Sequence, residues 1–162
     1  MNLNPDATEA MRTARQMAKD LRHEMVTTEH LLVALIAKPQ INHMLDALSI
    51  NAGDLHEQTM TYIVDKLGQS PVAIDEDLIM DAPAVQRVLN IAMSGALGLR
   101  SRAIEPLHLL AAIYHEDNSH ARFLLEHLGV YQNDVIHYIG NGAVATDPAV
   151  EDHAFDAAEF DD

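Results

Sequence analysis

The chain contains no cysteine and no tryptophan among its 162 residues. Without cysteine it has no disulfide scaffold, no thiolate zinc site and no cysteine nucleophile, and it suits a reducing compartment such as the cytoplasm. Aromatic residues make up only 4% of the chain, although 48% of it is hydrophobic. A core of this composition is built from Leu, Ile, Val, Ala and Met side chains, which favours helices over sheets.

Basic residues and long apolar runs are also scarce. Ten Lys and Arg stand against 25 Asp and Glu, so the formal net charge is −15. This charge repels nucleic acids and anionic membrane surfaces, and we expect neither as a partner. No run approaches the roughly 20 apolar residues that span a bilayer, and the first residues lack the pattern of a secretion signal. We therefore expect a cytoplasmic protein.

Apolar residues recur at helical spacing in four segments before residue 67. The segments cover about residues 6–21, 27–38, 41–48 and 51–66, and Pro39 ends the second of them. One stripe of the first segment is basic, and it either binds an anion or solvates the helix edge. The stripe consists of Arg12, Arg15, Lys19 and Arg22. Residues 67–83 contain Gly and Pro and show no sustained period, which predicts a linker.

An internal repeat is the most informative feature of the chain. A shift of 78 positions brings Thr28-Glu29-His30-Leu31-Leu32 over Pro106-Leu107-His108-Leu109-Leu110, and Ala14 over Ala92. The repeat predicts an all-α fold of two pseudo-symmetric four-helix repeats packed into one globular domain. Repeat one is expected at about residues 1–66 and repeat two at about 84–142.

The repeat also predicts where two helices begin. Proline is tolerated at the first helical position, so Pro106 and the matched Thr28 are expected there, with Thr27 as an N-cap. His30 and His108 then both take the third position of a short apolar helix. An imidazole at that position can satisfy a free backbone donor or brace the preceding loop, so we assign both histidines a structural role.

The end of the chain differs in composition from the rest. Residues 143–162 carry seven acids and neither Lys nor Arg. Such a segment cannot bury enough apolar surface to become ordered, so an acidic disordered tail or linker is expected. A chain shortened after Gly142 should then melt within a few degrees of the full chain.

No enzyme motif emerges from the sequence. There is no glycine-rich loop ending in Gly-Lys-Ser/Thr and no serine in a nucleophile elbow, so neither a nucleotide cofactor nor hydrolase chemistry is expected. The histidines are numerous, but none has the spacing of a zinc site on a helix. His23, Glu24, Glu29 and His30 are weak candidates for a metal if the loop between them folds back. The main expectation is that the domain has no metal and no cofactor.

One segment resembles a known family. Arg22-His23-Glu24-Met25-Val26-Thr27-Thr28-Glu29-His30-Leu31-Leu32 is similar to the Clp repeat, the N-terminal domain of the Clp/Hsp100 unfoldases, and the ClpA branch is the nearest match. Val85-Gln86-Arg87-Val88-Leu89, Phe123-Leu124-Leu125 and Ile139-Gly140-Asn141-Gly142 extend the resemblance over residues 1–142.

This resemblance implies a non-catalytic domain that docks a ClpS-type adaptor and substrate proteins onto an ATP-dependent Clp protease complex. It places the partner-binding edge at His23, Glu24, Thr27 and Glu29, with both carboxylates projecting from the same edge. No ATPase module follows in this sequence, so a stand-alone regulator that competes for adaptors is the alternative. A metal hydrolase built on His and Glu is a third hypothesis, and it would require a bound metal.

Overall fold

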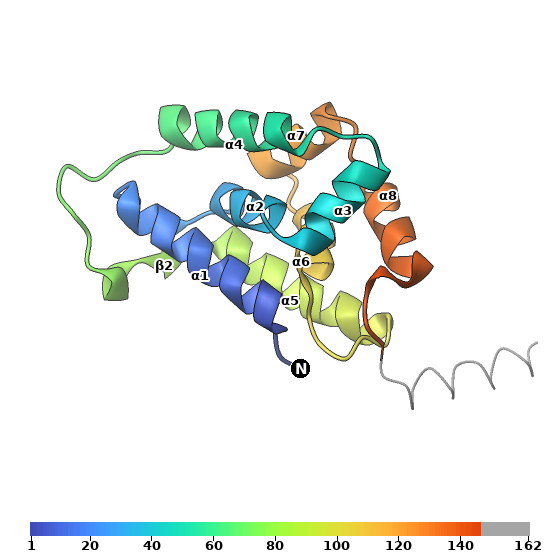
Figure 1. Cartoon of the computed structure of the whole chain (residues 1–162). Helices are drawn as coiled ribbons and strands as arrows, with labels where there is room; N and C mark the ends of the chain where they lie inside the picture. Colours follow the sequence, from blue (N-terminus) through green and yellow to red (C-terminus); the bar gives the residue numbers. More distant parts are fainter. Residues whose placement is uncertain (147–162) are drawn as a thin grey trace, which may run out of the picture.

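The computed structural model describes residues 1–146, and these residues form eight α-helices (Figure 1). The first four helices are α1 (Pro5–Asp20), α2 (Thr28–Ile36), α3 (Pro39–Ala47) and α4 (Ala52–Lys66). The second four are α5 (Pro83–Gly98), α6 (Pro106–Ile113), α7 (His120–His127) and α8 (Gln132–Tyr138), and a π-type turn (Ile139–Ala143) follows them. The predicted all-α fold is confirmed.

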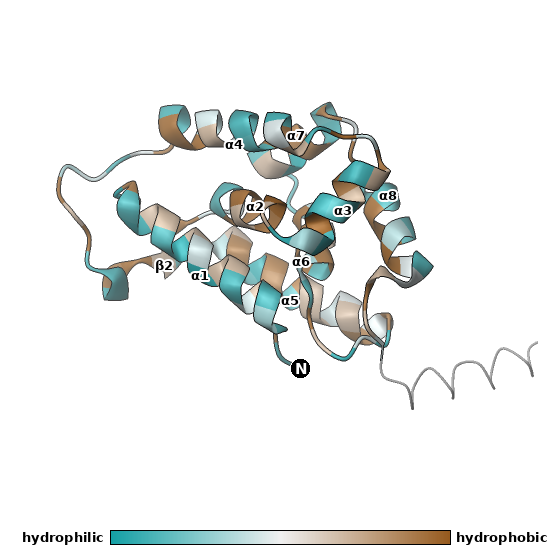
Figure 2. Ribbon diagram, in the orientation of Figure 1, coloured by the Kyte–Doolittle hydropathy of each residue, from teal (hydrophilic) through white to brown (hydrophobic). Residues whose placement is uncertain are grey.

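The two short apolar helices α2 and α6 form the centre of the molecule. Every residue of both helices is buried, and brown residues gather on α2 between the outer helices in Figure 2. The longer helices α1 and α5 pack on α2 and α6, respectively. They do so through small side chains, because α1 buries only alanines and α5 buries valines and alanines, which allows close approach of the backbones.

Proline marks the start of four helices. It occupies one of the first positions of α1, α3, α5 and α6, where the missing N–H has no helical partner to lose. For α3 this corrects the expected start, because the helix begins at Pro39 rather than near Ile41. Pro39 therefore both ends the preceding helix and begins the next.

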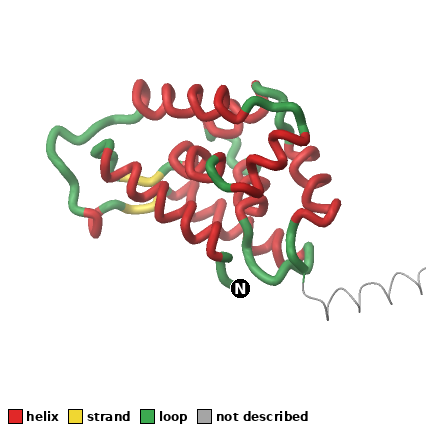
Figure 3. Tube along the Cα trace, in the orientation of Figure 1, coloured by secondary structure: helices red, strands yellow, loops and turns green. Residues whose placement is uncertain are grey.

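The segment predicted as a linker contains local structure and lies along α1. A short 3₁₀ helix (Glu76–Leu78) precedes strand β2 (Met80–Asp81), and β2 pairs in parallel with β1 (Met25–Val26), as Figure 3 shows in yellow. The pairing is too short to be recognised from alternation in the sequence.

Three cations of the basic stripe hold this segment against α1. Arg15 donates to the carbonyl of Ile79, Lys19 lies 3.8 Å from a carboxylate oxygen of Glu76, and Arg22 donates to the carbonyl of Pro71 over 3.2 Å. The stripe thus binds the chain's own linker.

Within residues 1–146, no helix has the length and apolar character needed to cross a bilayer.

The packed part of the chain extends past the boundary expected at Gly142. Val144 is only 7% exposed and belongs to the hydrophobic core. The backbone N–H of Ala145 donates to Glu105 Oε2 over 3.0 Å, and Gln40 Nε2 donates to the carbonyl of Ala143 over 3.0 Å. The prediction that the disordered tail starts at residue 143 is therefore wrong, because residues 143–145 pack on the domain. Positions 147–162 of that tail lie outside the described residues.

We expect a chain shortened after Gly142 to be less stable than one shortened after Thr146. Loss of the buried Val144 side chain and of the hydrogen bonds around it should lower the free energy of unfolding by about 2–3 kcal/mol. Urea denaturation of both shortened chains measures the difference. Equal midpoints would show that residues 143–146 contribute nothing to stability.

Candidate docking site

His30 and His108 make the same contacts in the two repeats. Each is the third residue of its helix, and its Nδ1 accepts the backbone N–H of the N-cap residue over 2.9 Å, from Thr27 to His30 and from Glu105 to His108. Because Nδ1 accepts, the proton is assigned to Nε2, which can donate to the preceding loop.

The loop partners of these two histidines differ between the repeats. His30 Nε2 lies 2.9 Å from Nδ1 of His23, and His108 Nε2 lies 3.0 Å from Oγ of Ser101. His23 and Ser101 are related by the same 78-residue shift. Both histidines thus connect the N-terminus of a central helix to the loop before it.

Burial keeps these imidazoles neutral. Desolvation lowers the pKa of His30 to about 4, with a smaller contribution from His23, and it lowers the pKa of His108 to about 4. Burial also lowers the pKa of His23. Both ring nitrogens of His30 are used in the fold, so this residue is a poor metal ligand. Among residues 1–146, no group of three His, Asp or Glu side chains is arranged to hold a metal ion.

A groove of about 430 Å³ opens beside the loop between α1 and α2. The loop side is lined by His23, Glu24, Met25 and Thr27. The opposite side is lined by Leu67, Gly68, Gln69, Ser70 and Pro71, which follow α4. We call this the docking groove, because the resemblance leads us to expect partner binding at its residues His23, Glu24 and Thr27.

Hydrogen bonds to backbone carbonyls fix the loop and its wall in place. Arg22 ends the turn after α1 in the left-handed region, with φ of 58°. Its carbonyl accepts the N–H of Ser70 over 2.8 Å, and Gln69 donates to the carbonyl of Leu21 over 2.9 Å. Glu24 and Met25 remain exposed at the rim, and Met25 is 46% exposed. A carboxylate and a thioether side chain are thus open to solvent on a fixed backbone.

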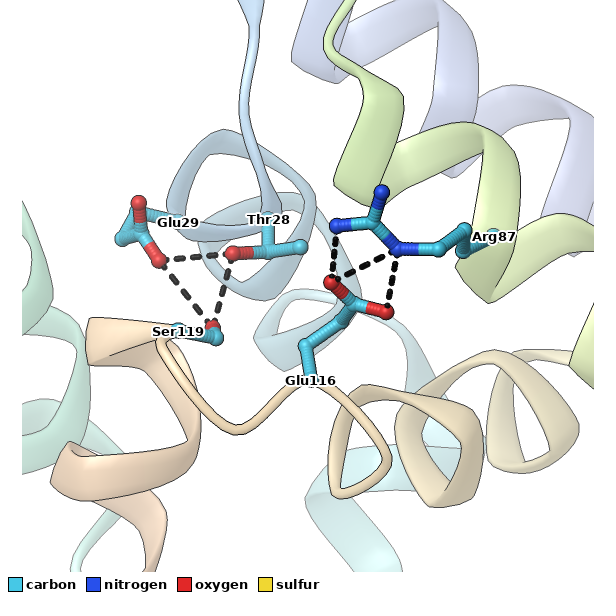
Figure 4. Close-up of polar contacts among 5 residues, drawn as sticks. All are labelled: Thr28, Glu29, Arg87, Glu116 and Ser119. Atoms are coloured by element: carbon cyan, nitrogen blue, oxygen red, sulfur yellow. Dashed lines mark hydrogen bonds and ion pairs between the residues drawn. The ribbon is translucent and has the colours of Figure 1, made fainter.

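The structure places Glu29 away from this groove, so the expectation that it projects beside Glu24 is wrong. Glu29 is 6% exposed and faces the N-terminus of α7 (Figure 4). Its Oε2 accepts hydrogen bonds from Thr28 Oγ1 at 2.6 Å, from the N–H of Ala121 at 3.0 Å and from Ser119 Oγ at 3.3 Å. Glu29 therefore caps a helix of the other repeat, where the helix dipole favours a negative charge.

A second polar contact in Figure 4 is the ion pair between Arg87 of α5 and Glu116. The guanidinium binds both carboxylate oxygens of Glu116, which is 8% exposed. The equivalent positions in repeat one, 78 residues earlier, are Glu9 and Lys38, and these also form an ion pair. The two repeats thus use the same pair of positions with the signs of the charges exchanged.

The sequence did not reveal two residues that matter at the site and at the repeat interface. Met25 lies in the groove rim but has no motif of its own. Gln40 connects the repeats, because its Oε1 accepts the N–H of Leu107 and its Nε2 donates to Glu105, over 3.0 and 2.8 Å. No periodicity signals such a contact, since the partners are 65 and 67 residues apart.

Comparison with known proteins agrees with the repeat architecture. The family model of the Clp repeat N-terminal domain matches residues 2–128. A ClpA homolog protein of Fuscovulum blasticum is 29% identical over 141 residues, which are 87% of this chain but only 18% of that relative. The chain therefore spans less than a fifth of the length of that relative.

Solved structures show the same fold. The N-terminal domain of Hsp104 from Candida albicans superimposes with a TM-score of 0.77 at 16% identity, covering 91% of this chain and 96% of that one. The ClpV N-domain in complex with a VipB peptide gives a TM-score of 0.63 at 17% identity, covering 83% and 82% of the two chains. From the family match over most of its length, we conclude that the chain belongs to the Clp repeat N-terminal domain family.

Proposed function

We propose that this domain is a non-catalytic docking module of an ATP-dependent Clp unfoldase, which receives substrate proteins and a ClpS-type adaptor. Family membership supports a docking role, and a domain of the same fold, the ClpV N-domain, is solved with a bound peptide. The observation that carries the proposal is the docking groove, where Glu24 and Met25 are exposed on a loop braced by buried hydrogen bonds.

The chemistry of the groove favours binding over catalysis. His30, which lies behind the groove, is neutral and has both nitrogens engaged, so it is poorly suited to act as a general acid or base near neutral pH. At the rim, the Glu24 carboxylate offers a charge-assisted contact to a cationic group. The flexible Met25 side chain can adapt to apolar side chains of different shape. The expected partner therefore presents a cationic and an apolar group side by side.

A double substitution at the rim tests this assignment. In Glu24→Lys/Met25→Asp, the carboxylate becomes a cation and the apolar contact becomes an acid, so affinity for a ClpS-type adaptor is expected to fall by about 30-fold or more, equivalent to about 2 kcal/mol. Isothermal titration with the purified adaptor measures the affinity. Thermal unfolding should show that the variant remains folded, since both side chains are exposed.

The matched control carries the same changes elsewhere on the surface. Asp46 is exposed, and Ile136 is 44% exposed, close to the value for Met25. Asp46→Lys/Ile136→Asp is expected to bind the adaptor within about twofold of the unmodified domain. If the rim variant binds as the control does, the adaptor docks elsewhere. If the unmodified domain does not bind the adaptor, the ClpS part of the proposal is wrong.

A further inference from the structure

A second groove lies between α4 of repeat one and α7 of repeat two. Its volume is about 530 Å³, and it shares no lining residue with the docking groove. The α4 side is formed by residues three or four positions apart, which turns one face of that helix toward the groove. We call it the interrepeat groove.

Two ring-bearing residues line the groove, Tyr62 of α4 and His120 of α7, and further rings follow along α7. The ring of Tyr62 stacks on His120 with 3.9 Å between centroids and 9° between planes. The ring of Phe123 follows 5.2 Å from His120 and stacks in turn on His127. Phe123 is 55% exposed, whereas its chain neighbour Leu124, which lines the groove, is buried. Ring contacts therefore extend from the groove along α7 to the exposed Phe123.

The α4 rim is acidic. Asp54, Glu57 and Asp65 are all exposed and line the groove, whereas Lys66 is the one Lys or Arg among the lining residues. Within the part of the chain that the structure describes, none of these three carboxylates forms an ion pair. The other side of α4 is used by the fold, because Leu55, Thr59 and Ile63 are buried. Its acidic face is exposed to solvent.

We propose that the interrepeat groove binds an extended basic peptide segment in which Arg or Lys residues are separated by one or two apolar residues. A guanidinium or ammonium group over the Tyr62 ring gains a cation–π contact, and Asp65, three residues further along α4, can accept its hydrogen bonds. Asp54 lies 11 residues before Asp65, about 16 Å away along the helix, so it can pair with a second cation of the same segment. An acidic segment is repelled by the same rim. An entirely apolar segment would desolvate the carboxylates without pairing them. The proposal concerns a different surface from the docking groove and does not rest on the adaptor assignment.

Fluorescence anisotropy with a defined probe tests the proposal. The probe is a labelled, acetylated and amidated peptide, Leu-Arg-Ala-Leu-Arg-Ala-Leu, and the comparison peptide has Glu in place of Arg. We expect saturable binding of the Arg peptide that weakens as salt is raised, because exposed charges are screened. The Glu peptide should bind at least about tenfold more weakly, a difference of about 1.4 kcal/mol.

Two matched variants separate the groove from the overall charge of the protein. Asp54→Asn/Asp65→Asn neutralises the rim and should weaken binding of the Arg peptide by about tenfold, equivalent to about 1.4 kcal/mol. Asp75→Asn/Asp77→Asn makes the same change in net charge at exposed positions outside the groove, and it should stay within about twofold. Tyr62→Leu keeps apolar bulk but removes the ring face, and it should cost about two- to fivefold.

Several results would overturn the proposal. The groove does not select a basic peptide if the Arg peptide fails to saturate the unmodified domain. The same conclusion holds if the Glu peptide binds equally well. If both double Asp→Asn variants lose the same affinity for the Arg peptide, binding depends on the net charge of the protein and not on the groove. Chemical-shift changes of labelled protein should map to α4 and α7, and changes centred on His23 to Thr27 would assign the peptide to the docking groove instead.

Discussion

Glu29→Lys is expected to lower the free energy of unfolding by about 3–5 kcal/mol. The substitution leaves the N–H of Ala121 without its buried acceptor and sets a cation against the N-terminus of α7, where the helix dipole is also positive. It further removes the acceptor shared by Thr28 and Ser119. Urea denaturation followed by circular dichroism measures the loss.

Two further variants show whether burial is the cause. Glu24→Lys makes the same change in charge five residues earlier at an exposed position, and it should alter stability by less than about 0.5 kcal/mol. Glu29→Gln keeps an acceptor oxygen for Ala121 and should cost about 1–2 kcal/mol. If Glu29→Lys unfolds at the same urea concentration as Glu24→Lys, the carboxylate does not support α7, and its place at the interface would have to be revised.

Acidification from pH 7 to pH 4 is expected to destabilise the domain through His30 and His108. Their pKa values are lowered from 6.5 to about 4 by burial, so the unfolded chain binds protons in this range that the folded domain does not. Stability from these groups is therefore complete above pH 6.5 and is lost as the pH falls through about 4. The loss should reach roughly 2–3 kcal/mol for each histidine.

Carboxylates also titrate near pH 4, so the histidine contribution is measured as a difference between variants. Glutamine at the third helical position can accept the same N-cap N–H without gaining a proton. His30→Gln/His108→Gln should therefore flatten the pH dependence between pH 6.5 and 4.5, although it lowers stability at pH 7. The control His43→Gln/His56→Gln changes two exposed histidines and should leave the slope unchanged. A slope that the first variant does not reduce would contradict neutral, buried imidazoles.

Much of the fold could be predicted because local rules and the repeat point to the same answer. The match of Thr28 with Pro106 places both at the first position of a helix, and the structure has both there, with Thr27 as the N-cap. Helix starts are governed by short-range hydrogen bonds and by the missing proline N–H, so they can be read from a few neighbouring residues. The contacts of His30 and His108 could be predicted for the same reason, because each imidazole accepts the N–H of a residue only three positions earlier.

Contacts between segments far apart in the chain could not be predicted in this way. Glu29 at the second position of its helix fits a favourable exposed charge as well as a buried cap, and only the placement of α7 decides between them. The linker shows no sustained period because it is held by Arg15 and Lys19 of α1 and by Arg22 just after that helix, rather than by its own alternation. The groove wall at residues 67–71 is also positioned by long-range contacts, in which Ser70 and Gln69 donate to the carbonyls of Arg22 and Leu21.

The exchanged charges of the two ion pairs also bear on how the chain finds its correct partners while folding. In backbone terms α1 and α5 are alike: both have 16 residues, and each is followed two residues later by an arginine in the left-handed region. If α1 docked on α6 in place of α5, Glu9 would face Glu116, and α5 on α2 would set Arg87 against Lys38. Both mispaired arrangements bring like charges together at partly buried positions, which is costly. The opposite order of charges in the two ion pairs thus favours docking of each long helix in its own repeat.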